Sequence, residues 1–205
     1  YSLYYYVEGL LWAGSPYAFH TIGSTLLINH KHYALARGFP KRSAGEDFYL
    51  LNKLAQTGKI HSLKEPYITL SGRSSARVPF GTGPAITKIS ALAQSEQDYL
   101  YYHPQCFLHL QEWLRFMPTL WETKDLQETL GGGLLLDCLS ELGVEAAMAH
   151  ALQHSKSRAS FIKHMHNWFD AFKTLKLIHN LRDLGLASIN HKQLQSYNNE
   201  FPFIA

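Results

Sequence analysis

The sequence predicts an α/β protein, with short strands in residues 1 to 90 and a mainly α-helical region in residues 91 to 205. Three observations lead to this prediction. In the first part, short apolar runs of strand length alternate with short helical patterns. After Pro84, apolar residues recur at helical spacing in the long segments. A loop rich in Gly, Pro and Ser, residues 71 to 85, separates the two kinds of pattern.

The composition is that of an ordinary globular chain. Hydrophobic residues make up 46% of the 205 residues, charged residues 17% and aromatic residues 13%, which excludes a solvated, disordered segment. A chain of this length can build one good-sized core, or a core with a helical extension.

The first part contains short elements. Its apolar pattern predicts helices over residues 2–13, 30–37 and 46–57, and strands over residues 25–28, 59–63 and 67–70. The helix over residues 46–57 is the best supported, because its apolar residues recur at helical spacing and Gly58 stands where a left-handed C-cap belongs. The second part is predicted to form helices over residues 85–94, 96–117, 124–142, 144–154, 158–184 and 190–197.

Charge is unevenly distributed along the chain. The net charge is +3, but residues 1 to 90 hold 10 Lys/Arg against 4 Asp/Glu, whereas residues 91 to 205 hold 9 against 12. A basic first part suits an anionic ligand such as a phosphate-bearing small molecule. It lacks the dense Lys/Arg clusters of a nucleic-acid surface, so no nucleic-acid partner is expected.

Cysteine usage and hydropathy indicate a cytoplasmic protein. Cys106 and Cys138 are too few for a disulfide framework or a zinc site, which favours a reducing compartment. Apolar runs stay far below the roughly 20 residues of a transmembrane helix, so membrane association is expected only through parts outside this sequence. The first residues resemble neither a chain start nor a signal peptide, and we expect them to come from within a longer chain.

An acidic pair, Glu46 and Asp47, stands at the amino end of the helix predicted over residues 46–57. Carboxylates there are stabilised by the helix dipole and by unsatisfied N–H groups, by about 0.3 to 1 kcal/mol, so a capping role is one interpretation. A carboxylate held on a rigid helix end beside a cleft could equally act as a general base. The spacing does not separate these two roles.

The loop over residues 71–85, SGRSSARVPFGTGPA, could bind phosphate. Its glycines can present backbone N–H groups, and Arg73 and Arg77 can present guanidinium groups to phosphate oxygens. The loop has neither a P-loop Lys nor a dinucleotide-type G-x-G-x-x-G, and surface arginines are common.

Residues 13–60, AGSPYAFHTIGSTLLINHKHYALARGFPKRSAGEDFYLLNKLAQTGKI, resemble the second half of the catalytic domain of an inverting, family 2 glycosyltransferase of the GT-A fold. The resemblance covers about residues 1 to 90 and depends on the order Gly-Ser, strand, GGF-like turn, Glu-Asp and strand pair. It implies a partial GT-A, Rossmann-like half-domain over residues 1–90, followed by a helical domain over residues 91–205.

The resemblance also implies a mechanism. Asp47 would be the base that deprotonates the acceptor hydroxyl, with Glu46 as its companion, and the sugar would be transferred from a nucleotide-sugar donor to a carbohydrate or lipid-linked acceptor with inversion. The substrate-binding residues would be Arg73, Arg77, Gly23, Ser24 and His20.

One part of the family's pattern is missing, because no D-x-D motif occurs in the chain. In the complete enzyme that motif would hold a divalent metal, Mg²⁺ or Mn²⁺, against the diphosphate. Its ligands would have to lie before Tyr1, so we expect this fragment to be inactive alone. An unpaired sheet edge could then favour a homodimer. The alternative is a non-catalytic helical interaction module in which Glu46 and Asp47 only cap a helix.

Histidines offer one further candidate. His150 and His154 are four residues apart on a predicted helix, a spacing that suits two zinc ligands. There is no H-E-x-x-H motif and no nearby Cys, so a chance pairing among 12 histidines is the simpler interpretation, and no metal site is predicted.

Overall fold

The computed structural model describes residues 2–63, 65, 69, 82–92 and 99–204, and it is mainly helical. Helices account for 64% of the structure and strands for 2%. The elements in chain order are α1 Ser2–Trp12, η1 Gly23–Thr25, α2 His30–Leu35, α3 Glu46–Thr57, α4 Thr82–Ser90, β1 Leu100–Tyr101, α6 Gln105–Phe116, η2 Met117–Thr119, α7 Leu120–Thr123, α8 Leu126–Leu130, α9 Leu134–Glu141, α10 Val144–His154, α11 Arg158–Trp168, α12 Ala171–Leu184, β2 Ile189–Asn190, α13 His191–Gln195 and η3 Pro202–Ile204.

The predicted α/β fold, a partial GT-A half-domain, is therefore wrong. Among the described residues the only sheet is the pair β1 and β2, neither of which lies where a strand was predicted. At residues 25–28 a 3-10 turn ends at Thr25, and Leu27 beyond it is 88% exposed. Residues 59–63 form no regular element, and most of residues 67–70 lie outside the described residues. Short apolar runs do not become strands without a partner strand to satisfy their backbone groups.

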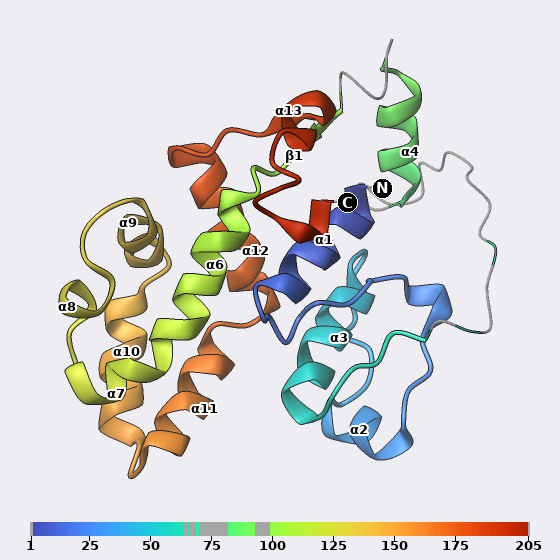
Figure 1. The fold of residues 1–205 in the computed structure, drawn as a ribbon. Helices are drawn as coiled ribbons and strands as arrows, with labels where there is room; N and C mark the ends of the chain where they lie inside the picture. Colours follow the sequence, from blue (N-terminus) through green and yellow to red (C-terminus); the bar gives the residue numbers. More distant parts are fainter. Residues whose placement is uncertain (1, 64, 66–68, 70–81, 93–98, 205) are drawn as a thin grey trace. The chain divides into compact units, whose positions relative to one another are not determined.

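The chain, whose elements are labelled in Figure 1, divides into two compact units. Unit 1 comprises residues Tyr1–Ala18, Tyr101–Ile189 and Gln193–Ala205, and unit 2 comprises Phe19–Leu100 and Asn190–Lys192. Residues 19–100 thus form most of unit 2, and three segments far apart in the sequence share unit 1.

Unit 1 has a dense helical core in which α12 packs against both α6 and α9. Its largest fully buried side chains are Trp113, Phe107, Phe161, Phe169, Leu110, Met117, Leu120, Leu139, Met165, Leu177 and Ile178. Burying each such side chain contributes about 1.5 to 3 kcal/mol. The indole N–H of Trp113 is the one buried side-chain polar atom in the described part of the chain that has no hydrogen-bond partner.

An aromatic cluster joins α1, α6 and the end of the chain within unit 1. The ring of Phe107 on α6 lies 5.6 Å from that of Tyr5 and 5.3 Å from that of Phe203, centroid to centroid. Trp12, at the end of α1, lies 5.3 Å from Phe203 in the same way. These T-shaped and tilted contacts are the favoured arrangements for aromatic pairs.

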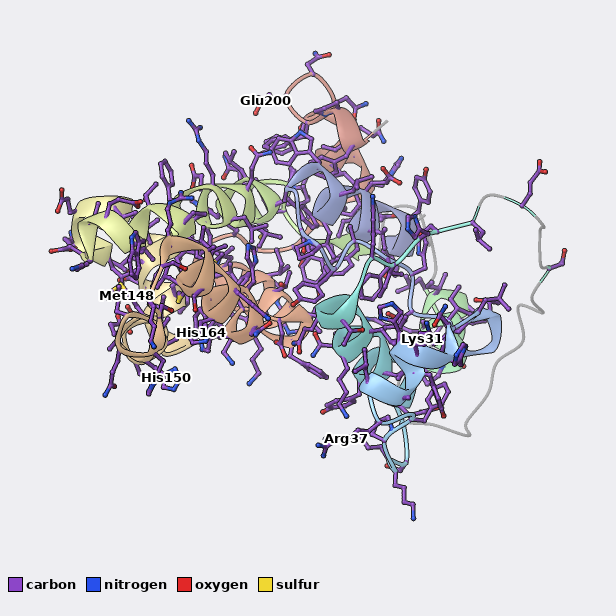
Figure 2. All side chains as sticks on the ribbon, turned by 90° about the horizontal axis from the view of Figure 1, so that it is seen from below. Lys31, Arg37, Met148, His150, His164 and Glu200 are labelled. Atoms are coloured by element: carbon purple, nitrogen blue, oxygen red, sulfur yellow. The ribbon has the colours of Figure 1, made fainter. Side chains whose placement is uncertain are left out.

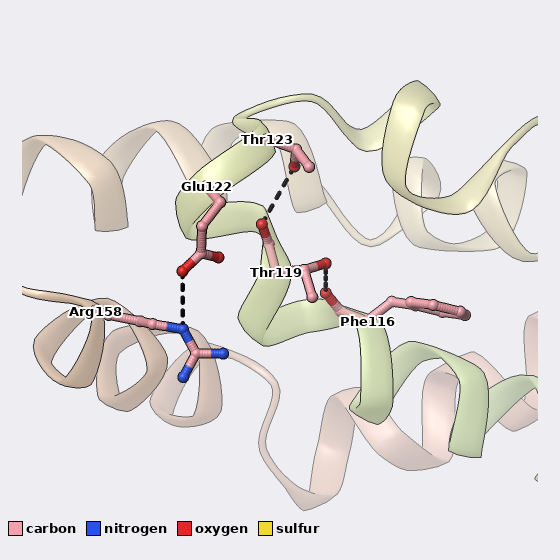
Figure 3. A network of polar contacts seen from close by, with 5 residues as sticks. All are labelled: Phe116, Thr119, Glu122, Thr123 and Arg158. Atoms are coloured by element: carbon pink, nitrogen blue, oxygen red, sulfur yellow. Dashed lines mark hydrogen bonds and ion pairs between the residues drawn. The ribbon is translucent and has the colours of Figure 1, made fainter.

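The corner after α6 is built around Pro118 and held by polar contacts (Figure 3). The hydroxyl of Thr119 donates to the carbonyl of Phe116 at 2.7 Å, and that of Thr123 donates to the carbonyl of Thr119 at 3.3 Å. Arg158 on α11 pairs with Glu122 on α7 at 3.0 Å. Both charged side chains are about half exposed, so their ion pair contributes at most about 1 kcal/mol.

The single helix predicted over residues 158–184 is wrong, because the chain breaks at Phe169 and Asp170 into α11 and α12. Phe169 leaves helical geometry at φ −85° and ψ 70°. Asp170 then caps α12 by accepting a hydrogen bond from the backbone N–H of Lys173 at 3.0 Å. Apolar residues recur at helical spacing on both sides of Phe169 and Asp170, so the sequence pattern gives no sign that the helix is broken there.

Unit 2 is built around α3, which confirms the helix predicted over residues 46–57. The helix buries Leu50, Leu51 and Leu54, and α2 packs against it. Gly58 adopts extended backbone, with φ −177°, so the predicted left-handed C-cap is wrong. The left-handed glycine is Gly45, which precedes the helix at φ 71°.

Candidate functional site

The carboxylate of Asp47 links the amino end of α3 to the η1 turn within unit 2. Its Oδ2 accepts a hydrogen bond from the backbone N–H of Gly23 at 3.1 Å, and its Oδ1 accepts one from the N–H of Phe48 at 2.8 Å. A Cβ at position 23 would meet Oδ2 at 3.0 Å, so the glycine lets the two chain segments approach closely. The structure thus brings together two residues that the sequence nominated separately.

The other predicted site residues differ in how far the structure describes them. Glu46, at the first position of α3, is exposed, and His20 is half-buried in the segment that leads to η1. The backbone of Ser24 lies in η1, and its side chain is not among those described. Arg73 and Arg77 lie outside the described residues, so the predicted phosphate-binding role of their loop stays a prediction.

A second feature of unit 2, not identified as a site from the sequence, is a stretch of chain with basic residues and no acidic ones. Between Glu8 and Glu46 the chain has no Asp or Glu but has four basic residues, Lys31, Arg37, Lys41 and Arg42. We call residues 27–42 the basic–apolar segment. The acid-free run can be found in the sequence, and all four of its cations lie between residues 31 and 42.

The α2 helix at the centre of this segment has an inner and an outer side. On the inner side, His32 Nδ1 lies 3.1 Å from Thr57 Oγ1 of α3, and the backbone carbonyl of the buried Ala36 accepts a hydrogen bond from Lys53 Nζ at 3.5 Å. On the outer side, Lys31 and Leu35, which are one turn apart, are exposed.

The end of α2 places a cation in strained backbone. The N–H of Arg37 donates to the carbonyl of Ala34, and that of Gly38 to the carbonyl of Tyr33, both at 3.0 Å, which is the Schellman pattern. Arg37 occupies the left-handed position of this motif, at φ 60°. Glycine is usual there, because a side chain in that conformation costs roughly 1 to 2 kcal/mol.

Exposed apolar side chains accompany the cations of the segment. Leu27 is 88% exposed, Leu35 67%, Phe39 44% and Tyr33 40%. The rings of Tyr33 and Phe39 pack edge to face, with centroids 6.2 Å apart.

The four basic side chains of the segment are exposed. Within the described residues Lys31, Arg37 and Lys41 form no ion pair, and Arg42 lies 3.6 Å above the ring of Tyr49. Figure 2 labels Lys31 and Arg37 on this segment. Basic and apolar groups are thus both presented to solvent over a short length of chain.

Four histidines of unit 1, His150, His154, His164 and His166, lie on α10 and α11. The rings of His150 and His154 are 4.4 Å apart, and those of His150 and His164 are 6.2 Å apart, centroid to centroid; Figure 2 labels His150 and His164. Even so, no group of three or more His, Cys, Asp or Glu residues in the described ranges is arranged to hold a metal ion.

Comparison with known proteins gives no further guide to the site. No protein-family model matches the chain, and no curated protein or solved structure is significantly similar to it. Among the described helices, none combines the length and the hydropathy needed to cross a bilayer.

Proposed function

We propose that this chain is a non-catalytic helical interaction module, whose basic–apolar segment binds an anionic partner. The observation behind this proposal is a group of exposed Lys and Arg side chains around α2 in unit 2, in a stretch of sequence that contains no Asp or Glu. Lys31, Arg37 and Lys41 are already solvated and are not neutralised within the described part of the molecule. A polyanion would gain their attraction without breaking an internal ion pair.

The geometry of Asp47 supports the same proposal. Both of its oxygens accept backbone N–H groups, which is the role of an acid that holds a turn against a helix end. This role accounts for Asp47 at the head of α3 without any reaction.

The proposal is tested by binding to a soluble polyanion. A fluorescent poly-glutamate peptide should bind the full chain, and its affinity should fall as salt is added. The triple variant Lys31→Gln, Arg37→Gly, Lys41→Gln should bind at least tenfold more weakly, because three attractive charges are lost.

A matched control removes the same charge from unit 1. Lys156, Lys163 and Lys176 are exposed, and changing all three to Gln lowers the net charge equally. This variant should bind the peptide almost as well as the unmodified chain. Equal weakening of both variants would show a non-specific effect of net charge and would contradict the proposal.

Sugar transfer is a second candidate function, favoured by one observation: Asp47 is only partly buried, and it stands on a helix end beside a close glycine turn. Two backbone bonds leave lone pairs of a carboxylate available for a hydroxyl proton.

The variant Asp47→Asn separates the two candidates. It keeps one acceptor oxygen but turns an amide NH2 toward the other backbone N–H, so it should lose up to about 1 kcal/mol of stability, and Asp47→Ala, which loses both acceptors, should lose more. Transfer of a labelled sugar by the unmodified chain that disappears in Asp47→Asn would establish the enzyme and overturn the non-catalytic proposal.

A further inference from the structure

We propose that the anionic partner of the basic–apolar segment is the surface of a lipid bilayer that contains acidic lipids. This inference rests on the proposed function and adds the class of partner. It begins from a feature that a soluble polyanion would leave unused: Leu27, Leu35 and Phe39 are exposed by 88%, 67% and 44%, and they alternate along the chain with Lys31, Arg37 and Lys41.

A bilayer surface offers an environment for both kinds of side chain. Lys and Arg can remain at the level of the lipid phosphates, while Leu and Phe enter the boundary with the acyl chains. Arg37 and Phe39 would suit a protein interface as well, but the two Lys and the two Leu residues of the segment would not, since protein interfaces are depleted in Lys and their strongest contacts are seldom Leu.

The local geometry allows a shallow insertion. With six residues, α2 is only about 9 Å long, so the helix alone is too short to anchor the chain. On the helix itself Lys31 and Leu35 share the outer side. Leu27 precedes the helix in the sequence and Phe39 follows it, and both add exposed apolar side chains to the segment. The inner side of α2 packs on α3, so only the outer side is available to contact a bilayer.

The strained backbone at Arg37 supports a functional role for this side chain. Glycine at this position would be the less strained choice, yet the chain has a cation there, between Leu35 and Phe39. Strain retained at a single residue is an observation from which a function can be inferred.

The experiment uses vesicles of known composition and the full chain. Sedimentation with vesicles of phosphatidylcholine and phosphatidylserine should show binding that weakens with salt, and vesicles of phosphatidylcholine alone should bind far less. The triple variant Lys31→Gln, Arg37→Gly, Lys41→Gln should lose roughly 100-fold in affinity, at about fivefold for each cation. The unit 1 control, with Lys156, Lys163 and Lys176 changed to Gln, should bind normally.

The apolar contribution is tested separately. The double variant Leu27→Ser, Leu35→Ser should weaken vesicle binding by more than tenfold while leaving poly-glutamate binding unchanged, because only the bilayer receives the apolar side chains. Unchanged vesicle binding by this variant would overturn the inference.

Arg37→Gly distinguishes a ligand-binding cation from a structural residue. Glycine relieves the left-handed strain, so the thermal midpoint of unfolding should rise or hold, while vesicle affinity falls by about fivefold. A lower midpoint together with unchanged affinity would show a structural role and overturn the assignment of Arg37.

Two further outcomes separate the inference from the function on which it rests. Binding to poly-glutamate without binding to acidic vesicles would overturn the bilayer and leave an acidic protein as the partner. Binding to neither would overturn both proposals.

Discussion

Gly9 determines how closely α1 approaches α6. A Cβ at this position would lie 2.6 to 2.8 Å from ring carbons of Phe107, well inside van der Waals contact. That ring is fully buried and contacts Tyr5 and Phe203, so it has little freedom to move away. The absence of a side chain is therefore a packing requirement of unit 1.

We expect Gly9→Ala to destabilise the chain although alanine favours helix. Alanine improves helix propensity by about 1 kcal/mol, but overpacking a rigid core costs about 1 to 3 kcal/mol, so a net loss results. Chemical denaturation would measure it. Phe107→Leu makes room for the methyl group, so Gly9→Ala should cost less in that background, and an equal cost in both would contradict the proposed clash.

At the scale of single residues, Asp47 and Gly23 show how far the sequence could lead. The position of Asp47 at a helix end followed from the apolar spacing behind it, and α3 begins at Glu46 as expected. Its bond to Gly23 joins residues 24 positions apart, which no local pattern encodes. Both were nominated, but only the structure shows that they touch.

At the scale of elements, helix spacing was informative and short apolar runs were not. The helix over residues 46–57 was predicted because enough apolar residues recur to define a face, and α3 has those bounds. The run over residues 25–28 is too short to distinguish a strand from a turn with adjacent extended residues, and the structure has the latter. The break at Phe169 was missed because the capping Asp170 lies within an otherwise continuous helical pattern.

That cap gives a prediction at the same scale. Asp170→Ala removes the acceptor for the N–H of Lys173, which leaves an N-terminal donor of α12 unsatisfied, and should cost about 1 kcal/mol of unfolding free energy. Asp170→Asn retains an acceptor and should cost only a few tenths of that. Thermal and chemical denaturation of the two variants would test the comparison, and an equal loss in both would contradict a capping role.

At the scale of the whole molecule, three histidines make the stability of unit 1 depend on pH. Burial lowers the pKa of His103, of His166 and of His179, and nearby Arg182 lowers that of His179 further. The ring nitrogens of two of them contact tyrosine hydroxyls: His179 with Tyr102 at 2.8 Å, and His103 with Tyr197 at 3.0 Å.

We therefore expect unit 1 to lose stability below the ordinary imidazole pKa of about 6.5. In that range these histidines are protonated in the unfolded chain, whereas burial keeps them neutral in the folded chain. The free energy of unfolding therefore decreases as pH falls, by at most about 1.4 kcal/mol per pH unit for each histidine. Above this pH the contribution is constant.

Denaturation between pH 5 and pH 8 would measure this dependence. His179→Gln removes one titrating group, and its stability should change less steeply with pH than that of the unmodified chain. An unchanged slope would contradict the role of His179.

The contacts of α1 with η3 have a consequence for synthesis. Residues near the start of the sequence complete their aromatic packing only with Phe201 and Phe203. During translation the contacts of Tyr5 and Trp12 with Phe201 and Phe203 therefore form only after residues 201 to 203 have left the ribosome. Until then, part of the apolar surface of α1 lacks its final partners and is of the kind that chaperones recognise.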